Sequence, residues 1–360
     1  MSEYKCEQDV FTTKYQLVTK GLAEIIGETE LKEKLNSDSP LKIYWGTSPT
    51  GSPSFAYYLP MIKICQLLKA GCEVTILFAD LHAYLDAMKT TWDLLKIRTE
   101  YYEIIIKEII KTLGGNVELI KFVKGSDYQL SKEYTIDVYK FLSKITVDQA
   151  QKGGAEVVKQ SENPLMSGLI YPILQVLDEV YLGCDAELGG LDQRKIFMMS
   201  RDHLHKLGYK SNIHLMNQML PSLAGKDGEK MSSSEPNSKI GLLDTPKEIK
   251  KKINKAFLEE SNTECGLFKI LELIIFPIIE LKEIELGSNK FIINRDEKWG
   301  GKLEFDNYEQ VVSQYKSNQI APPDIKLGIS DFINELINPI RCKFETPEMK
   351  ELYAKAYVKN

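Results

Sequence analysis

Residues 41–53 read Leu-Lys-Ile-Tyr-Trp-Gly-Thr-Ser-Pro-Thr-Gly-Ser-Pro, a short apolar run followed by a loop rich in Gly, Pro, Ser and Thr. Its first five residues suit a buried strand, and its turn-rich remainder leads into a helical pattern over about 55–70. Gly71 ends that helix, and a second strand rich in β-branched residues follows over 73–80. A strand, a helix and a second strand in succession predict a βαβ unit and therefore a parallel sheet.

The same alternation continues downstream. A long helix is expected over about 91–113, and a short strand over 119–123. Residues 131–184 look mainly helical, the glycines of 189–193 are expected to form a turn that opens another helix, and residues 213–216 suit a last strand. These elements extend the sheet and predict the α/β class.

The domain organisation follows from a change in pattern beyond Thr245, where helices follow one another with little strand signal. The chain of 360 residues is long enough for one large domain and one smaller domain. We therefore expect an α/β domain over residues 1–240 and a mainly helical domain over 241–360.

Composition narrows the class of protein. A net charge of −5 gives no signal for nucleic acid at the level of the whole chain, although local basic patches can still bind it. No run of about 18 apolar residues is present and the first residues are polar, so neither a membrane span nor a secretion signal is expected. The six cysteines are scattered without a C-x-x-C pair, which argues against a zinc site or a disulfide framework. The cytoplasm is the expected location, because free cysteines suit a reducing compartment.

Two loops have the character of phosphate-binding segments. Residues 230–234 read Lys-Met-Ser-Ser-Ser, and a flexible lysine beside hydroxyl groups suits the charge that develops on a reacting triphosphate. The loop over 46–54 lies between the carboxyl end of a strand and the start of a helix, where backbone N–H groups favour phosphate. The alternatives stay open, because 230–234 also suits a solvated polar loop and many such strand-to-helix loops bind nothing.

A polar stripe lies on an otherwise apolar helix. Tyr171, Gln175 and Asp178 are spaced by four and three residues, which places them on one helix face. A buried carboxylate without a basic neighbour needs a donor, and an amino acid with a hydroxyl-bearing side chain supplies both an ammonium and a hydroxyl. An internally satisfied polar network is the alternative. Residues 189–193 add a glycine pair before Asp192, a weak signal for binding ribose hydroxyls.

Together, these segments resemble the class I aminoacyl-tRNA synthetases, and more closely the tyrosyl-tRNA synthetases of the archaeal and eukaryotic cytoplasmic type. The resemblance extends to residues 71–86, 154–160, 214–217 and 296–301. It implies a class I synthetase nucleotide-binding (Rossmann-like) parallel-sheet domain, which is catalytic and carries a connective insertion at about 125–165. A mainly helical anticodon-binding domain would follow it. No appended domain follows Asn360, so the minimal form of the enzyme is expected.

The activity implied by the resemblance is ATP-dependent ligation of L-tyrosine to tRNA(Tyr). The carboxylate of tyrosine attacks the α-phosphate of ATP and gives tyrosyl-adenylate and pyrophosphate, and the 3′-terminal ribose of the tRNA then takes the acyl group and releases AMP. Mg²⁺ should accompany ATP, held mainly by phosphate oxygens, so no protein metal ligands are expected. The resemblance further implies a homodimer and no association with a membrane.

The resemblance also carries roles onto residues of this chain. Tyr44 and Asp178 would bond the phenol of tyrosine, and the groups around its α-ammonium would be Tyr171, Gln175 and Gln193. ATP would be bound by Gly46, Thr47, Gly51, Ser54, Tyr57, Gly190, Asp192 and Lys230. The groups that act on the reacting phosphates would be Lys230, Ser232, Ser233 and Ser54.

Four residues look like contacts to tRNA. Arg194 and Lys195 correspond to acceptor-end contacts, and Trp299 and Asp324 fall where the family meets the anticodon. A tryptophan can stack on a splayed base, and an aspartate can accept a hydrogen bond from a guanine edge. A core tryptophan and a helix-capping aspartate are the structural alternatives at the last two positions.

The chain departs from the family pattern at the HIGH-type signature. Residues 53–57 read Pro-Ser-Phe-Ala-Tyr, so Ser54 stands where the family has a histidine that donates to the ATP phosphates. Loss of one such donor typically costs roughly 3–4 kcal/mol of transition-state stabilisation. A catalytically weak tRNA-binding or regulatory paralogue is therefore the alternative function, whereas Tyr44 with Asp178 disfavours a tryptophanyl enzyme. The further departures are Glu187 (usually an amide), Gln218, Ser222 and Gly241.

Overall fold

The computed structural model describes residues 12–86, 90–158, 163–221, 223, 239–286 and 289–357. The chain divides into two compact units. Unit 1 comprises Met1–Gly51, Gln66–Glu103 and Asn116–Met219, and unit 2 comprises Ser52–Cys65, Ile104–Gly115 and Leu220–Asn360. The units interleave along the chain, so the expected domain boundary at residue 240 stays a prediction.

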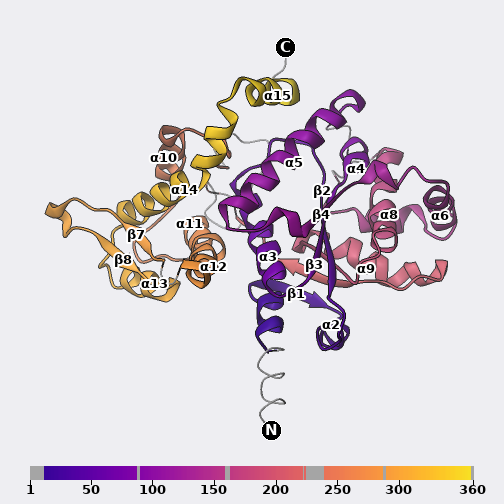
Figure 1. The fold of residues 1–360 in the computed structure, drawn as a ribbon, viewed down its shortest axis with the longest axis horizontal. Coiled ribbons are helices and arrows are strands. Elements are labelled where there is room, and N and C mark those ends of the chain that lie inside the picture. The colour runs from indigo at the N-terminus through magenta and orange to yellow at the C-terminus, as the bar shows by residue number, and fades with distance from the viewer. Residues whose placement is uncertain are drawn as a thin grey trace, which may run out of the picture. The chain divides into compact units, whose positions relative to one another are not determined.

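Unit 1 is built on a mixed sheet of six strands within the described residues (Figure 1). In chain order the strands are β1 (Leu22–Ile26), β2 (Lys42–Thr47), β3 (Glu73–Phe78), β4 (Ile120–Lys124), β5 (Ala186–Gly190) and β6 (Ile213–Asn217). Their order across the sheet is β1-β6-β5-β2-β3-β4. Strands β2 to β6 pair in parallel, and β1 runs antiparallel against β6. The parallel sheet predicted from the alternation of strands and helices is confirmed.

The strand order places a topological switch point at the centre of the sheet. The chain passes from β2 to β3 and β4 on one side, and later returns to the other side of β2 with β5 and β6. Ligands of open α/β sheets bind in the crevice beyond the carboxyl ends of the strands at such a point. The segments that follow β2 and β5 are therefore the first candidates for a binding site.

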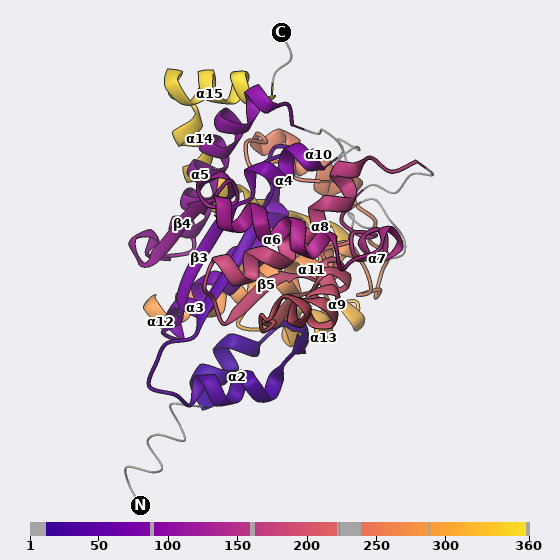
Figure 2. The same cartoon turned by 90° about the vertical axis from the view of Figure 1, so that its right-hand side faces the viewer.

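Helices cover the sheet of unit 1. The helices of this unit are α2 (Glu28–Leu35), α4 (Asp80–Leu85), α6 (Lys132–Leu142), α7 (Val147–Gly153), α8 (Met166–Tyr181) and α9 (Arg194–His203). Helices α3 (Tyr58–Lys69) and α5 (Leu95–Thr112) each contribute residues to both units. Side chains of α6, α8 and α9 share one apolar cluster, and the three helices lie together on one side of the sheet (Figure 2).

Helix α8 is positioned by its apolar residues. Ile173, Val176 and Leu177 are at most 1% exposed, and burial of each such side chain stabilises the fold by about 1.5–3 kcal/mol relative to an exposed position. Their partners include Tyr134 and Phe141 of α6, both fully buried. Because these contacts fix the rotation of α8, its polar stripe is held in one direction.

Three elements of unit 1 differ from the sequence prediction. Strand β1 and helix α2 were not predicted, and the glycines expected to form a turn belong to β5. Strand β1 is an edge strand whose residues are only partly buried, so it lacks a clear apolar alternation. Strand β5 reads Ala-Glu-Leu-Gly-Gly, a composition with low β propensity that the two neighbouring strands override.

Unit 2 is mainly helical in its described part, as predicted. Its elements after residue 220 are α10 (Pro246–Lys255), α11 (Gly266–Ile270), a π-helical turn (Leu271–Ile275), α12 (Phe276–Leu286), β7 (Phe291–Ile293), β8 (Leu303–Phe305), α13 (Tyr308–Lys316), α14 (Pro322–Phe344) and α15 (Pro347–Tyr357). Strands β7 and β8 pair in antiparallel fashion. None of the helices in the described ranges combines the length and the apolar character that spanning a bilayer requires.

Candidate active site

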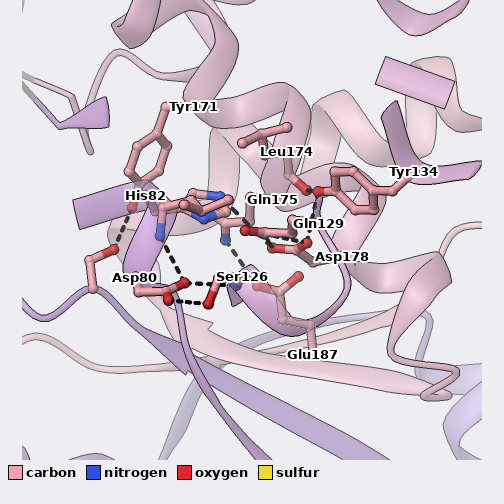
Figure 3. Close-up of polar contacts among 12 residues, drawn as sticks. Asp80, His82, Ser126, Gln129, Tyr134, Tyr171, Leu174, Gln175, Asp178 and Glu187 are labelled. Atoms are coloured by element: carbon pink, nitrogen blue, oxygen red, sulfur yellow. Dashed lines mark hydrogen bonds and ion pairs between the residues drawn. The ribbon is translucent and has the colours of Figure 1, made fainter. Parts of the chain in front are cut away.

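The five residues expected to bind tyrosine converge within unit 1. Tyr44 lies on β2, while Tyr171, Gln175 and Asp178 project from α8. Gln193 ends the short 3₁₀ turn Leu191–Gln193 that follows β5. These elements meet at the switch point of the sheet, and Figure 3 shows the polar side chains of α8 turned toward one another and toward the strands.

Asp178 is the carboxylate of this group and is 1% exposed. Gln129 donates to both of its oxygens, over 2.8 and 3.0 Å, and the Tyr134 hydroxyl donates to Oδ1 over 2.9 Å. Burial raises the pKa of Asp178 to about 7, and the hydrogen bonds from Gln129 and Tyr134 act in the opposite direction. The carboxylate is thus partly satisfied inside the protein and titrates near neutral pH.

His82 lies beside this carboxylate. Its Nε2 is 3.8 Å from Oδ2 of Asp178, and its ring meets the ring of Tyr171 edge-on with centroids 4.7 Å apart. Burial lowers the pKa of His82 to about 4, so the imidazole is neutral at physiological pH. His82 therefore contributes packing and a polar edge rather than a positive charge.

Side-chain hydrogen bonds of Gln175 link α8 to β5 and to the turn that follows β5. Nε2 of Gln175 donates to Oε1 of Glu187 over 2.9 Å and to Oε1 of Gln193 over 3.1 Å. Tyr171 shares a hydrogen bond of 3.3 Å with Ser48, in the loop after β2. The hydroxyl of Tyr44 is buried and has no hydrogen-bond partner among the described residues. A buried hydroxyl without a partner is expected where a polar group of a ligand binds, because the ligand would supply the missing hydrogen bond.

Sequence reasoning missed three members of this network. Gln129 and Tyr134 hold Asp178, and Glu187, noted only as a departure from the family pattern, bonds Gln175. Gln129 and Tyr134 are separated from Asp178 by 49 and 44 residues, so no local spacing connects them. The one available signal was the polar character of Glu187 in a strand that is otherwise small and apolar.

The residues expected to bind ATP are only partly brought together. Gly46 and Thr47 end β2, and the carbonyl of Gly51 accepts the Tyr102 hydroxyl over 2.5 Å. A Cβ at Gly190 would lie 2.5 Å from Oδ1 of Asp192, so a larger residue there would displace the Asp192 side chain. These five residues belong to unit 1 and surround the carboxyl ends of β2 and β5.

The remaining members of that set belong to unit 2 or lie outside the described residues. Ser54 and Tyr57 belong to unit 2, where Ser54 forms an isolated antiparallel bridge with Gly241. Lys230, Ser232 and Ser233 lie outside the described residues. The groups expected to act on the reacting phosphates therefore stay predictions.

Three of the four expected tRNA contacts, Arg194, Lys195 and Trp299, are exposed on the surface. Arg194 forms a two-pronged ion pair with Glu24, over 2.8 and 3.0 Å, and Lys195 pairs with Glu156 over 3.0 Å. Trp299 is 69% exposed, which excludes the core alternative for this residue.

Asp324 has a structural role. Its Oδ2 accepts from the backbone N–H of Ala321 over 3.1 Å, at the start of α14, and lies 3.4 Å from Nη1 of Arg295. It occupies the third helical position rather than the N-cap, and it stabilises the helix start through that bond. This observation supports the helix-capping alternative and leaves a base contact untested.

Comparison with known proteins defines the class. Residues 36–338 match the family described as tRNA synthetases class I (W and Y). The chain belongs to this family of class I tRNA synthetases. The archaeal tyrosyl-tRNA synthetase of Archaeoglobus fulgidus, solved in complex with L-tyrosine, superposes with a TM-score of 0.82 at 34% identity, covering 92% of this chain and 99% of that one. The predicted class I synthetase fold is confirmed.

Two relatives of similar sequence are named as tyrosine–tRNA ligases, which narrows the assignment within the family. The cytoplasmic tyrosine–tRNA ligase of Saccharomyces cerevisiae is 46% identical over 348 residues, which are 95% of this chain and 87% of the yeast protein. The cytoplasmic tyrosine–tRNA ligase of Danio rerio is 50% identical over 345 residues. The match covers 96% of this chain but 63% of the length of the Danio rerio protein.

Proposed function

We propose that the chain ligates L-tyrosine to tRNA(Tyr) with ATP, through a tyrosyl-adenylate intermediate that releases pyrophosphate and then AMP. The observation that carries the proposal is that two buried polar groups lie near the switch point of the sheet: the Tyr44 hydroxyl, which has no hydrogen-bond partner among the described residues, and the Asp178 carboxylate. The names of the relatives support it, since the yeast and Danio rerio proteins are tyrosine–tRNA ligases.

The pocket chemistry suits the phenol of tyrosine. A phenolic O–H would donate to Asp178 and accept from Tyr44, while Gln175, Gln193 and Tyr171 would hold the ammonium end. A site with buried groups that bond a hydroxyl rejects phenylalanine strongly, because those groups would lose their partners. Selection against phenylalanine would then come from binding alone.

Activation needs charge stabilisation at the ATP phosphates. In the proposed reaction the tyrosine carboxylate attacks the α-phosphate, and ATP enters with its Mg²⁺ as the substrate complex. Backbone N–H groups after β2, together with Lys230, Ser232 and Ser233, would take up the developing negative charge. Ser54 would donate in place of the family's histidine, over a shorter reach. The enzyme would supply position and charge rather than a covalent intermediate.

The partners are proposed on the same basis. Arg194 and Lys195 would meet the acceptor end of tRNA(Tyr), and Trp299 with Asp324 would meet the anticodon. Both basic side chains are about half exposed, so an RNA phosphate could replace their carboxylate partners on the surface. A homodimer in the cytoplasm is proposed from the family resemblance and from the cytoplasmic names of the relatives.

The test is tyrosine-dependent ATP–pyrophosphate exchange on the purified chain, with tryptophan as the control substrate. Exchange with tyrosine and not with tryptophan is the expected result. Ser54→His is measured beside the native chain, because it restores the family's donor. Exchange that occurs only in Ser54→His would overturn the proposed activity of the native chain and leave a tRNA-binding paralogue. Charging of tRNA(Tyr) and filter binding of tRNA would distinguish the two functions, because a paralogue of this kind binds tRNA without charging it.

A further inference from the structure

Three side chains form a row across the sheet beneath α8. Strand pairing places Tyr44 of β2 beside Glu187 of β5, and Glu187 beside His214 of β6. Residues that are register partners in neighbouring strands project from the same face of a sheet. Glu187 therefore lies between a phenol and an imidazole, at 3% exposure.

His214 is committed to another carboxylate. Its Nε2 lies 3.0 Å from Oε1 of Glu179, whose Oε2 accepts from Ser200 Oγ over 2.8 Å and from the backbone N–H of Asn212 over 3.0 Å. Glu179 thus has a partner at each oxygen, as an ionised buried carboxylate requires. The imidazole that serves Glu179 through Nε2 does not offer that nitrogen to Glu187.

Glu187 is much less well satisfied. Its Oε1 accepts from Nε2 of Gln175 over 2.9 Å, while its Oε2 is buried and has no hydrogen-bond partner among the described residues. An ionised carboxylate in such a place would lose most of its hydration and could gain at most the hydrogen bonds of Gln175 and Tyr44, both of which act to lower its pKa. That arrangement costs several kcal/mol, and the usual response is to keep the proton.

The surroundings of Glu187 also disfavour a negative charge. The titratable groups that face it are Tyr44 from β2, His214 from β6, Asp178 and Glu179 from α8, and Tyr128 from the segment after β4. Of these, His214 is the one group that can carry positive charge, and it is bonded to Glu179. Burial first, and then the charge of Glu179, raises the pKa of Glu187 well above its usual range.

We propose that Glu187 is a neutral carboxylic acid at physiological pH and is a positioning residue for tyrosine recognition. Its Oε1 accepts the Gln175 amide, and its Oε2–H is directed to the oxygen of Tyr44. The hydroxyl hydrogen of Tyr44 is then free to be donated to the phenol of the substrate. This inference rests on the proposed function.

Loss of the proton would reverse that arrangement. When Oε2–H gives its proton to solvent, the carboxylate accepts the hydroxyl hydrogen of Tyr44 instead. The oxygen of Tyr44 and the carboxylate of Asp178 would then both present acceptors to a phenol that has one hydrogen to give. Preference for tyrosine over phenylalanine is therefore expected to fall on the alkaline side.

The experiment measures equilibrium binding of L-tyrosine and L-phenylalanine from about pH 7.5 to about pH 9.5. The ratio of the two Kd values cancels the titration of the α-ammonium, which both ligands share. The variant is Glu187→Gln, since an amide also has one acceptor and one donor but cannot ionise in this range. The control is Asp137→Asn. Asp137 of α6 accepts hydrogen bonds from Tyr181 and Tyr209, and its pKa lies below the usual range, so this carboxylate does not titrate between the two pH limits.

The ratio is the Kd of L-phenylalanine divided by the Kd of L-tyrosine. As the pH rises across this range, the ratio of the native chain is expected to fall about tenfold, the size of one reversed hydrogen bond, and that of Glu187→Gln by less than about twofold. Asp137→Asn should follow the native curve. A second readout is the infrared difference spectrum between the native chain and Glu187→Gln at neutral pH. A protonated-carboxyl C=O band that disappears in the variant is expected.

Three results would overturn the proposal. The first is a native Kd ratio that changes no more than that of Glu187→Gln, and the second is a pair of carboxylate bands in place of the protonated-carboxyl band. The third is a metal ion that copurifies with the native chain and is lost in Glu187→Gln, because Glu179, Glu187 and His214 place ligand atoms within 4.8 Å of one another. If no tyrosine binds at all, the proposed function fails, and the infrared spectrum still decides the protonation of Glu187.

Discussion

Tyr134 and Asp178 are joined by a hydrogen bond of 2.9 Å, from the phenol of α6 to the carboxylate of α8. Both residues are fully buried, and the same hydroxyl also lies 2.9 Å from the carbonyl of Leu174. One phenol therefore couples the position of α6 to the charge state of the carboxylate that is proposed to bind tyrosine. The helix that carries Tyr134 belongs to the segment expected to be a connective insertion, so this segment supplies a hydrogen bond to the proposed tyrosine site.

Tyr134→Phe is expected to weaken tyrosine binding near neutral pH. A hydrogen bond to a charged group contributes about 1.5–3 kcal/mol, and its loss raises the pKa of Asp178 further, so less of the carboxylate is ionised at pH 7. The tyrosine Kd should rise by roughly tenfold or more at pH 7 and recover partly at pH 8.5. Tyr139→Phe is the control, because Tyr139 lies on the same helix and is 67% exposed. An equal loss at both pH values would show a packing defect instead.

The stability of the protein is expected to depend on pH through Asp178. Its pKa rises from 3.8 in a model compound to about 7 in the fold, so the native state binds this proton more tightly than the unfolded chain does. The free energy of unfolding should therefore fall as pH rises from about 4 to about 7, by roughly 2–4 kcal/mol from this group. Asp178→Asn should flatten that part of the profile, measured by thermal unfolding across the range. A slope unchanged in the variant would contradict the assignment.

Gly189→Ala is expected to damage both the fold and the tyrosine site. The added Cβ would lie 2.6 Å from the ring of Phe197 and 3.0 Å from Cγ of Gln193, and neither the ring nor the turn can move without disturbing its neighbours. A loss of about 1–3 kcal/mol in unfolding free energy, with a raised tyrosine Kd, is expected. Gly154→Ala is the matched control, since its Cβ would meet ordinary contacts at 3.5 Å or more. Similar unfolding temperatures for the two variants would refute the steric argument.

Trp299→Ala is expected to act on tRNA. The side chain is 69% exposed, and stacking of a base on an aromatic ring is worth about 1–3 kcal/mol, so the KM for tRNA(Tyr) should rise by about tenfold or more in aminoacylation. Trp92→Ala is the comparison, because Trp92 is 58% exposed in the other unit. A rise in KM that is equal in the two variants would remove Trp299 from the anticodon site.

The sequence predicts the parts of this molecule that depend on local pattern. The spacing of Tyr171, Gln175 and Asp178 is a property of one helix, and the structure has them on one face of α8 as expected. The donors of Asp178 cannot be read in this way, because the turn that carries Gln129 and the helix that carries Tyr134 reach it only when they pack against α8. The same holds for Glu187, whose unusual environment is created by its two neighbouring strands.

The glycines of β5 show a second limit of local reasoning. A turn is the normal prediction for Gly189 and Gly190, yet both pair with β6. The absence of a side chain at these two positions leaves room for Phe197 and Asp192, which approach the backbone closely. Such crowding is a property of the folded chain. Lys230 and the serines after it stay predictions from the sequence, since they lie outside the described residues.

Strand β1 has a consequence for the behaviour of the protein in concentrated solution. All residues of β6 are buried, and β1 covers the hydrogen-bonding edge that β6 would otherwise present. An uncovered apolar edge strand is a template on which another chain can add its own strand. Release of Leu22–Ile26, by proteolysis or by a proline at a paired position, would therefore expose this edge of β6 and favour aggregation.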